Sequence, residues 1–442
     1  MENKKKFSAA QIILLGFLSV IAAGTLLLCL PFSSASGKFT AFTDAFFTAT
    51  SATCVTGLSV NVTAEYWSVF GQIVILLLIQ IGGLGFMTFV TLIIFFIRGR
   101  VGLFNRKVLM QSAGIPNLGS VFKLFRRILL GTLIAELIGA GLLSASFVPE
   151  FGGAHGVYLA VFHAISAFCN AGFDILGSNS LVPYRGEPLV ILTISLLIVV
   201  GGLGFVVWSN VFDGKFRWKK FNLHTKIVLI ATAVLIVVPT LLFLVFEWNY
   251  TLKDLPFGEK LLAAFFQAVS PRTAGFYTIN QAEMSDSAYV LTMILMFIGG
   301  NSGSTAGGIK TTTLVIILFS VLAEVQKSDY IIIGKRKLPA GDAKTASAIL
   351  SLYTMMIAFS TMIICAVEPS ATLKDVLYEI VSAICTVGLS LGVTAELSVI
   401  SKLIITLLMF VGRVGSISVA LALGERKHTP PVDLPTENIM IG

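Results

Sequence analysis

The sequence predicts an all-α integral membrane protein made of four pseudo-repeated helix–re-entrant loop–helix units. Two observations predict this class. First, 56% of the 442 residues are apolar and 12% are charged, which is about half the charge that a soluble domain uses to cover its surface. Second, apolar runs of about 20 residues, the length needed to cross a bilayer, recur along the whole chain. The net charge of +8 does not indicate nucleic-acid binding, because the basic residues stand in short clusters between apolar runs.

Eight apolar segments are long enough to be predicted as spans, with approximate ranges 11–31, 70–97, 121–148, 188–212, 225–247, 288–325, 345–367 and 397–424. The first follows Lys4–Lys6 and is similar to a signal peptide, but it is too long for one, so we expect a retained span. The segment 288–325 is too long for one crossing, and the polar stretch Asn301–Thr313 interrupts it.

Four shorter apolar segments alternate with the spans, and each ends in a turn that contains glycine. They cover residues 40–52, 155–168, 258–270 and 373–384. The turn glycines are almost evenly spaced along the chain, and an aromatic residue stands ten positions before each one. The glycines are Gly57, Gly172, Gly275 and Gly388, and the aromatic residues are Phe47, Phe162, Phe265 and Tyr378. The chain therefore repeats four times with a nearly constant period.

A second glycine signal recurs at a similar distance beyond each turn, in the middle of the following apolar segment. It comprises Gly82-Gly83-Leu84-Gly85-Phe86, Gly201-Gly202-Leu203-Gly204-Phe205, Gly299-Gly300 and Gly412-Arg413-Val414-Gly415. The two signals divide the chain into units at 1–100, 101–220, 221–335 and 336–424, followed by a tail at 425–442.

The distribution of Lys and Arg predicts the orientation. Of 31 basic residues, 22 lie at the termini and in the linkers between units, and 7 lie on the side that holds the four short segments. Positive residues mark the cytoplasmic side, so both termini are expected in the cytoplasm. The opposite side carries 14 acidic residues, a balance that attracts cations.

The four turns are predicted to form the filter of one central pore. Irregular backbone within a bilayer survives only where it is buried in protein or lines a water-filled cavity. The short helices would point their partly negative C-terminal ends at the axis, and the turns would present backbone carbonyls to a cation. The predicted potassium-binding residues are Val55, Thr56, Gly57, Asn170, Ala171, Gly172, Thr273, Ala274, Gly275, Thr386, Val387 and Gly388.

The chemistry of these turns favours potassium. None carries the acidic side chain that is typical of calcium or sodium pores. Thr386-Val387-Gly388 matches the first half of the potassium-channel TVGYG sequence, and the Tyr-Gly half is absent. We expect one strong ion site and less stringent selection against sodium. A membrane hairpin with small packing residues accounts for one such segment, but not for four in phase.

The four turns, the Asn301–Thr313 stretch and Arg413 resemble the Ktr/Trk/HKT potassium transporters, and in particular the membrane subunit of bacterial Ktr systems. The resemblance covers nearly the whole chain. It implies potassium uptake across the bacterial plasma membrane by a homodimer with one pore per subunit. It also implies a cytoplasmic ring of nucleotide-binding, RCK-type regulatory subunits, which would bind ATP or ADP. This chain has no Walker loop, and we expect it to bind no cofactor other than K⁺.

The polar stretch in the third unit is the predicted gate. Its glycines and hydroxyl residues would let it fold across the cavity below the filter, and the resemblance implies the same role. The gate residues are Asn301, Ser302, Gly303, Ser304, Thr305, Ala306, Gly307 and Gly308, with Lys310 and Arg413. A charge at mid-span, such as Arg413, is functional or paired by default. Lys310 either assists the gate or extends toward the cytoplasm.

Several other polar residues are assigned structural roles. Glu136 lies mid-span and would pair with a neighbouring helix. The cysteines Cys54, Cys169 and Cys385 each precede a turn glycine by three positions, but the fourth position is Arg272, which opposes a metal site. His155 and His163 are expected to form local hydrogen bonds.

The linkers and two rival functions complete the prediction. Lys215–Lys220, Lys335–Lys337 and the segment 426–442 are either docking surfaces for the regulator or topology determinants only. A sodium- or proton-coupled symporter would have inverted repeats and titratable residues at the midplane, whereas these repeats are parallel and Glu136 is the only mid-span acid. An enzyme is excluded because no catalytic constellation is present.

Overall fold

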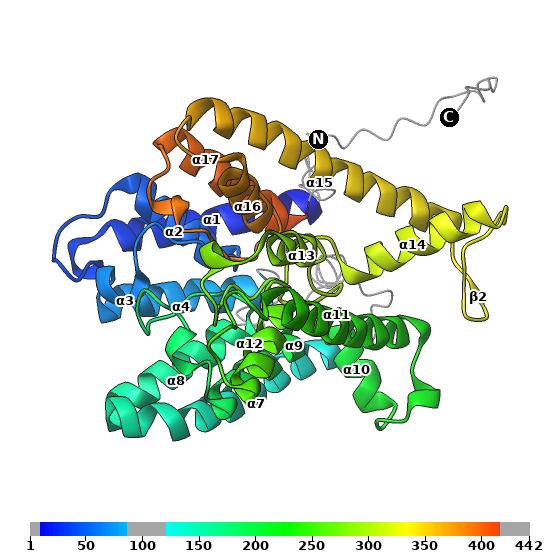
Figure 1. The fold of residues 1–442 in the computed structure, drawn as a ribbon, viewed down its shortest axis with the longest axis horizontal. Coiled ribbons are helices and arrows are strands. Elements are labelled where there is room, and N and C mark those ends of the chain that lie inside the picture. The colour runs from blue at the N-terminus through cyan, green and yellow to red at the C-terminus, as the bar shows by residue number, and fades with distance from the viewer. Residues whose placement is uncertain (1–8, 86–120, 416–442) are drawn as a thin grey trace, which may run out of the picture.

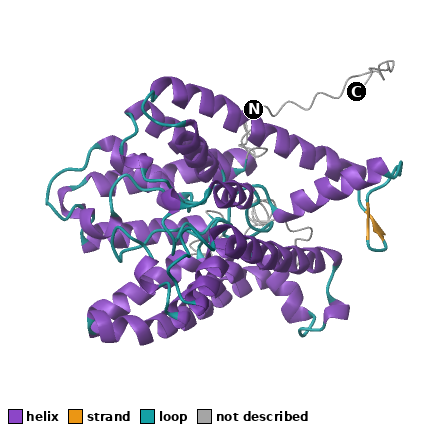
Figure 2. Ribbon diagram, viewed as in Figure 1, coloured by secondary structure: helices purple, strands orange, loops and turns teal. Residues whose placement is uncertain are grey.

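The computed structural model describes residues 9–85 and 121–415, and this part of the chain is mostly helical (Figures 1 and 2). Its two short strands, β1 (Ile332–Ile333) and β2 (Arg336–Lys337), pair as an antiparallel hairpin. The predicted tail at 425–442, the linker at 98–120 and the ends of the second and eighth predicted spans lie outside the described residues.

Three kinds of helix follow one another along the chain. Long outer helices are α1 (Ala9–Cys29), α7 (Val121–Phe151), α11 (Leu223–Glu247) and α15 (Ala340–Val367). Each is followed by a shorter helix, which we call a pore helix after the pore that the sequence predicts: α2 (Phe42–Thr53), α8 (Gly153–Phe168), α12 (Phe257–Val269) and α16 (Leu373–Ile384). The inner helices come third: α4 (Val69–Leu84), α9 (Pro188–Gly202) with α10 (Phe205–Asp213), α13 (Asp286–Phe297) with α14 (Thr311–Val325), and α17 (Val399–Val414). The short helix α3 (Thr63–Tyr66) precedes α4.

The inner helices differ from the continuous spans that the sequence predicts. Within the described ranges, four helices are long and apolar enough to cross a membrane, and these are parts of the four outer helices. The predicted span 188–212 is instead two helices bent by 91°. The cause is the second glycine signal: Gly85, Gly204 and Gly415 have φ of +83°, +95° and +93°, a conformation that ends an α-helix.

The helices pack in a cyclic order. Each pore helix contacts its own outer and inner helices, and it also contacts the inner helix of the preceding unit. The pairs between units are α4 with α8, α9 with α12, α13 with α16, and α17 with α2. The last pair joins the fourth unit to the first, so the contacts between units form a closed cycle.

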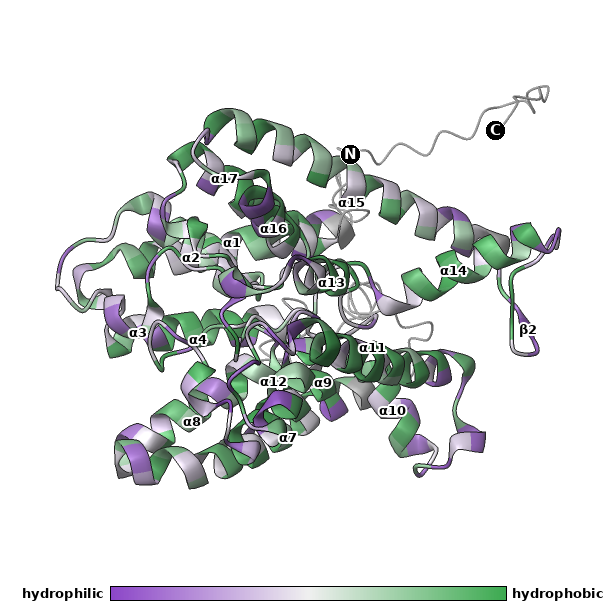
Figure 3. Ribbon diagram, in the orientation of Figure 1, coloured by the Kyte–Doolittle hydropathy of each residue, from purple (hydrophilic) through white to green (hydrophobic). Residues whose placement is uncertain are grey.

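The outer helices expose apolar stripes. On α7 the exposed residues include Leu130, Leu133, Ile134 and Leu137, and on α11 they include Ile230, Val234, Val237, Val238 and Leu241. Helix α11 is mostly hydrophobic in Figure 3. Spacings of three and four positions place these side chains on one helix face, and exposed apolar surface of this extent indicates contact with lipid. The chain is a multi-pass membrane protein.

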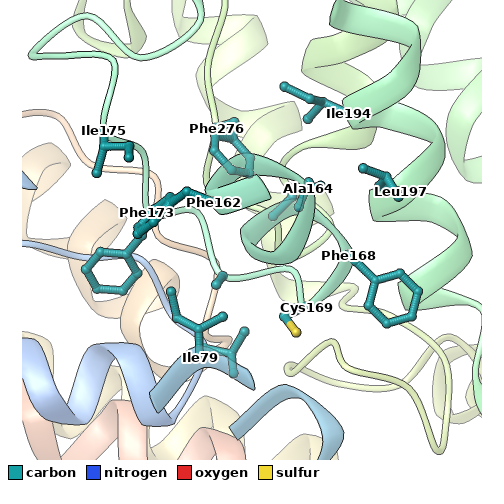
Figure 4. Packing of buried hydrophobic residues seen from close by; sticks show 14 of the residues in the cluster. Ile79, Phe162, Ala164, Phe168, Cys169, Phe173, Ile175, Ile194, Leu197 and Phe276 are labelled. Carbon is teal, nitrogen blue, oxygen red and sulfur yellow. The ribbon is translucent and has the colours of Figure 1, made fainter. Parts of the chain in front are cut away.

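The buried core lies around the pore helices. Figure 4 shows one part of it, where Phe162, Ala164 and Phe168 of α8 pack between Ile79 of α4 and Ile194 of α9. Phe147, Phe162, Phe168 and Phe276 are fully buried. Lipid tails are as apolar as these side chains, so within the membrane the core is stabilised by close van der Waals packing rather than by the hydrophobic effect.

Candidate functional site

The four glycine turns, widely separated in sequence, meet at one point and form a closed ring. A Cβ atom added to Gly57 would lie under 3.0 Å from the Ala171 oxygen, and one on Gly172 would lie equally close to the Ala274 oxygen. The same relation joins Gly275 to Val387 and Gly388 to Thr56. We call this arrangement of residues 55–57, 170–172, 273–275 and 386–388 the four-turn ring. It brings together all twelve predicted filter residues.

The backbone of the ring has the same unusual conformation in every turn. The third residue, glycine, has φ between +69° and +94°. The first residue also has positive φ: Val55 +57°, Asn170 +58°, Thr273 +75° and Thr386 +52°. Such values are costly for β-branched residues, and strain of this kind persists only where the surroundings enforce it. The sequence indicated the glycines but not the three β-branched residues.

A buried serine at the end of each pore helix holds its own turn in place. Gly57 N donates to Ser51 Oγ and Gly388 N donates to Ser382 Oγ, both at 3.1 Å. Ser166 Oγ donates to the Phe173 carbonyl at 2.7 Å, and Ser270 Oγ donates to the Phe276 carbonyl. The serine recurs in phase in the four repeats, so the sequence carried this signal, although the prediction missed it.

The third turn is one residue shorter than the other three. Its serine, Ser270, stands five positions before Gly275, whereas the other serines stand six positions before their glycines. Phe266 is therefore fully buried in the place held elsewhere by Phe47, Phe162 and Tyr378. Phe265, the aromatic residue ten positions before Gly275, is half-buried instead.

The second glycine signal lets the inner helices contact the ends of the pore helices. A Cβ on Gly82, Gly201 or Gly412 would collide with the carbonyl oxygen of Thr53, Phe168 or Ile384, respectively. In the third unit the corresponding Gly299 lies instead against Gly307 of its own unit. Three units are alike here, and the third differs.

The difference comes from residues 298–310, which we call the crossing loop. The loop leaves α13, crosses under the four-turn ring and returns at α14. It is not a loose segment: Asn301 N and Thr305 N donate to the Gly202 and Gly201 carbonyls (3.1 and 3.4 Å), and Phe205 N donates to Gly303 O (2.9 Å). These bonds satisfy carbonyls that the broken inner helix of the second unit leaves free.

The loop also contacts the ring and the second pore helix. Thr305 Oγ1 donates to the Phe168 carbonyl at 3.2 Å. A Cβ on Gly307 would collide with Thr386 Oγ1, so the loop lies directly against the fourth turn. The helix α14 begins at Thr311, so Thr311–Thr313 of the predicted polar stretch are helical.

Two basic side chains hold the loop. Arg413 extends from α17 and donates to the Thr305 carbonyl, and also to the Gly82 and Gly83 carbonyls at the end of α4 (2.5 and 3.2 Å). It therefore bridges the fourth, third and first units. Lys310 Nζ donates to the Ala306 and Gly307 carbonyls (2.6 and 3.3 Å). Of the two alternatives for Lys310, its side chain folds back onto the loop.

On the opposite side of the ring lies a polar vestibule of about 310 Å³. All four turn glycines line it, together with loop residues that include Ser59, Asp174, Tyr277, Gln281, Ser390, Gly392 and Thr394. Asp174 is the one charged residue that the described chain contributes to this lining, and sequence reasoning missed it. Burial raises the pKa of the Asp174 carboxyl from 3.8 to about 6. In the sequence, Asp174 could have been identified by its position two residues beyond the turn glycine Gly172.

The remaining candidates have separate roles. The three cysteines are buried behind the turns, and the described residues form no group of three or more potential His, Cys, Asp or Glu metal ligands. Glu136 accepts from Gln80 Nε2 (3.1 and 3.4 Å), and Cys169 Sγ donates to Gln80 Oε1 (3.6 Å). Arg272 is buried, and its Nε has no hydrogen-bond partner within the described chain.

The two histidines differ. His163 bonds the Leu159 carbonyl through Nδ1 (2.7 Å) and accepts from Ile175 N (3.4 Å). His155 lies between the rings of Phe151 and Tyr158.

This fold and ring define a class, the multi-pass membrane proteins in which re-entrant segments meet at a central axis. Comparison places the chain within it. The TrkH family of cation transport proteins matches residues 7–426, so the chain belongs to this family, whose members are ion transporters and not enzymes.

Individual relatives cover the chain almost fully. It is 41% identical to the potassium/sodium uptake protein NtpJ of Enterococcus hirae, over 99% of this chain and 98% of that protein. It is 39% identical to the Ktr system potassium uptake protein B of Bacillus subtilis, over 96% and 95% respectively. The crystal structure of the potassium transporter TrkH from Vibrio parahaemolyticus matches with a TM-score of 0.76 and 18% identity, covering 96% and 87%, which establishes a shared fold.

Proposed function

We propose that this chain carries K⁺ into the bacterial cell through a filter of backbone carbonyls in the four-turn ring. One observation carries the proposal: the turns of four successive units close into a ring with a common backbone conformation. Alternation of positive φ at the first and third residue turns successive carbonyls the same way, as a carbonyl filter requires. The four units are then four copies of one helix–re-entrant loop–helix design around one pore, crossing the membrane eight times.

The electrostatics of the site favour a cation. The pore helices end at the turns, so their partly negative C-termini face the ring. The vestibule adds the carboxylate of Asp174, and among the described residues no basic side chain lines it. Short turns without a Tyr-Gly extension leave room for one strong site, which we expect to bind K⁺ with moderate selectivity over Na⁺.

The crossing loop, with Lys310 and Arg413, is the gate in this proposal. It lies against the inner end of the fourth turn and is hydrogen-bonded to the second unit and to Arg413 of the fourth unit. Deleting residues 302–308 removes these bonds, and we expect uptake without the regulator to rise. An equal or lower rate in membranes that contain normal amounts of the deletion variant would contradict the gate.

Regulation would come from a partner. We propose a homodimer that docks on a cytoplasmic ring of nucleotide-binding subunits, which bind ATP or ADP. The relative in Bacillus subtilis is named as one protein of a Ktr system, which supports a multi-component assembly. The basic linkers at 215–220 and 335–337 are exposed and lie on the same side of the molecule (Figure 1), as a common docking surface requires. Both termini would lie on this cytoplasmic side.

The deciding experiment is growth of an uptake-deficient bacterial strain at limiting K⁺, with and without a co-expressed regulatory subunit. The proposal expects growth and K⁺ uptake that saturate with K⁺ concentration. If the chain reaches the membrane, and supports neither growth nor uptake with the regulator, the proposed function is wrong.

A second candidate is K⁺ uptake coupled to Na⁺ or H⁺. The Enterococcus hirae relative is named as a potassium/sodium uptake protein, and Glu136 offers a buried carboxyl that is linked through Gln80 to the second turn. Uptake measured with and without external Na⁺, and at two external pH values, separates coupled transport from a pore.

A further inference from the structure

Each pore helix buries one polar side chain three positions before its serine. These residues are Thr48, His163, Gln267 and Glu379, and each is at most 1% exposed. The last three reach past their own turn to the chain that lines the vestibule or lies beside it. His163 accepts from Ile175 N, Gln267 exchanges hydrogen bonds with Gln281, and Glu379 contacts Ser390 and Thr394. Among them, Glu379 alone is an acid.

Glu379 is the centre of a hydrogen-bond network behind one wall of the vestibule. One carboxylate oxygen accepts from Ser390 Oγ and the other accepts from Thr394 Oγ1 at 3.0 Å. Ser390 Oγ in turn accepts from Gly392 N at 2.8 Å. Gly392 has φ of +95°, which glycine adopts readily, and the bond from its N–H ties this turn to Ser390 and so to Glu379.

The residues held by Glu379 belong to the vestibule. Ser390, Gly392 and Thr394 all line it, and Ser390 is two positions beyond Gly388. A carboxyl side chain presents two oxygens and can accept several hydrogen bonds at once. Glu379 is therefore suited to fix the position of the fourth turn and of the wall above it.

The second and fourth units, on opposite sides of the ring, carry their acidic residue in different places. In the ring order the second turn faces the fourth, because each of them neighbours the first and the third. In the second unit the acid, Asp174, is two positions beyond the glycine and the pore helix carries His163. In the fourth unit the acid is on the pore helix, and Ser390 occupies the place of Asp174. Two carboxyls thus flank the ring, one in the vestibule wall and one behind it.

We propose that Glu379 is a positioning residue for cation binding, which sets the affinity for K⁺ by holding the Gly388–Thr394 wall of the vestibule. This inference rests on the proposed function. It assigns the effect to binding, so the concentration of K⁺ at half-maximal uptake should change while the maximal rate does not.

The test measures net K⁺ uptake against external K⁺ concentration in K⁺-depleted cells of an uptake-deficient strain that expresses the full chain and its regulator. We expect Glu379→Ala to raise KM by about fivefold or more, with a maximal rate within about twofold of wild type once corrected for membrane abundance. Glu379→Gln keeps one acceptor and should give a smaller rise. Ser390→Ala with Thr394→Val should reproduce the Ala effect, and adding Glu379→Ala to that pair should give no further rise, because the residues act as one network.

The matched control is Glu247→Gln. Glu247 is also fully buried and also accepts from two hydroxyls, those of Ser285 and Thr251 at 2.6 Å each, but it does not line the vestibule. Its loss should lower membrane abundance and leave KM unchanged. An equal rise in KM for this control would overturn the inference, since any buried acid would then serve.

The remaining outcomes distinguish failure of this inference from failure of the proposed function. An unchanged KM in Glu379→Ala overturns the inference while the proposed function stands. If that variant fails to reach the membrane, an unchanged KM in both Glu379→Gln and Ser390→Ala overturns it. Absence of K⁺-dependent uptake in wild type, by contrast, counts against the proposed function itself.

Discussion

The four units resemble one another in the four-turn ring, but the third unit differs from the other three below the ring. In the ring itself the four units share one backbone conformation: positive φ at the first and third turn residues occurs four times, and a buried serine supports each turn. Below the ring three units are alike, with an inner glycine against a pore-helix carbonyl, whereas the third unit inserts the crossing loop. A homotetramer cannot have one such exception, because any change is copied into each subunit. The single chain can keep a regular binding ring and give one unit a different task.

The strongest test of this comparison is to substitute the turn glycines one at a time. Gly388→Ser places a side chain at φ of +90° and against the Thr56 carbonyl, which costs about 1–2 kcal/mol from conformation alone. We expect K⁺ uptake or K⁺-over-Na⁺ selectivity to fall by about tenfold or more. The same change at Gly57 and at Gly172 should have a similar effect. Unchanged competition between Na⁺ and K⁺ in Gly388→Ser would contradict the filter assignment.

The second test removes the bridge below the ring. Arg413→Ala leaves the Thr305 and Gly82 carbonyls without their charged donor, and hydrogen bonds to charged groups contribute about 1.5–3 kcal/mol each. We expect uptake in the absence of the regulator to rise by about tenfold. Arg413→Lys, which cannot reach both carbonyls with a planar fork, should lie between wild type and Ala. If Arg413→Ala left uptake without the regulator unchanged, Arg413 would not be part of the gate.

The third test uses the charge of the vestibule. The pKa of Asp174 is raised by burial to about 6, so the carboxyl is charged above this pH and neutral below it. The apparent affinity for K⁺ should therefore fall, by about threefold, as the external pH drops from 7.5 to 5. In Asp174→Asn the affinity should be low at both values. If the variant retains the full pH dependence, another group is responsible.

The smallest effect is expected at Glu136. The residue is linked to the second turn only through Gln80 and Cys169, so Glu136→Gln should change KM by less than about twofold. A loss of Na⁺ stimulation in this variant would instead favour coupled transport. Uptake at several Na⁺ concentrations distinguishes the two outcomes, with Gln80→Ala as the companion variant.

The sequence predicted the parts of this site that repeat. The nearly even spacing of the four turns located every member of the ring, the polar interruption located the loop, and the charge at mid-span singled out Arg413. The sequence did not predict features that depend on tertiary contacts rather than on residue type. Val55 and Thr386 have positive φ because their neighbours enforce it, and nothing in their residue type indicates this. Likewise, the bend at Gly204 follows from the crossing loop, which binds the carbonyls that the bend exposes.

The bonds of the crossing loop have a consequence for energy coupling. In the proposed gating, opening breaks the hydrogen bonds that join the loop to Gly201, Gly202, Phe168 and Arg413, each contributing about 1 kcal/mol net. Their sum is comparable to the roughly 5.5 kcal/mol that moves a two-state equilibrium from 1:99 to 99:1. A regulator that distinguishes its two nucleotides by this amount could switch the protein almost fully, and one that distinguishes them by less would only adjust the leak.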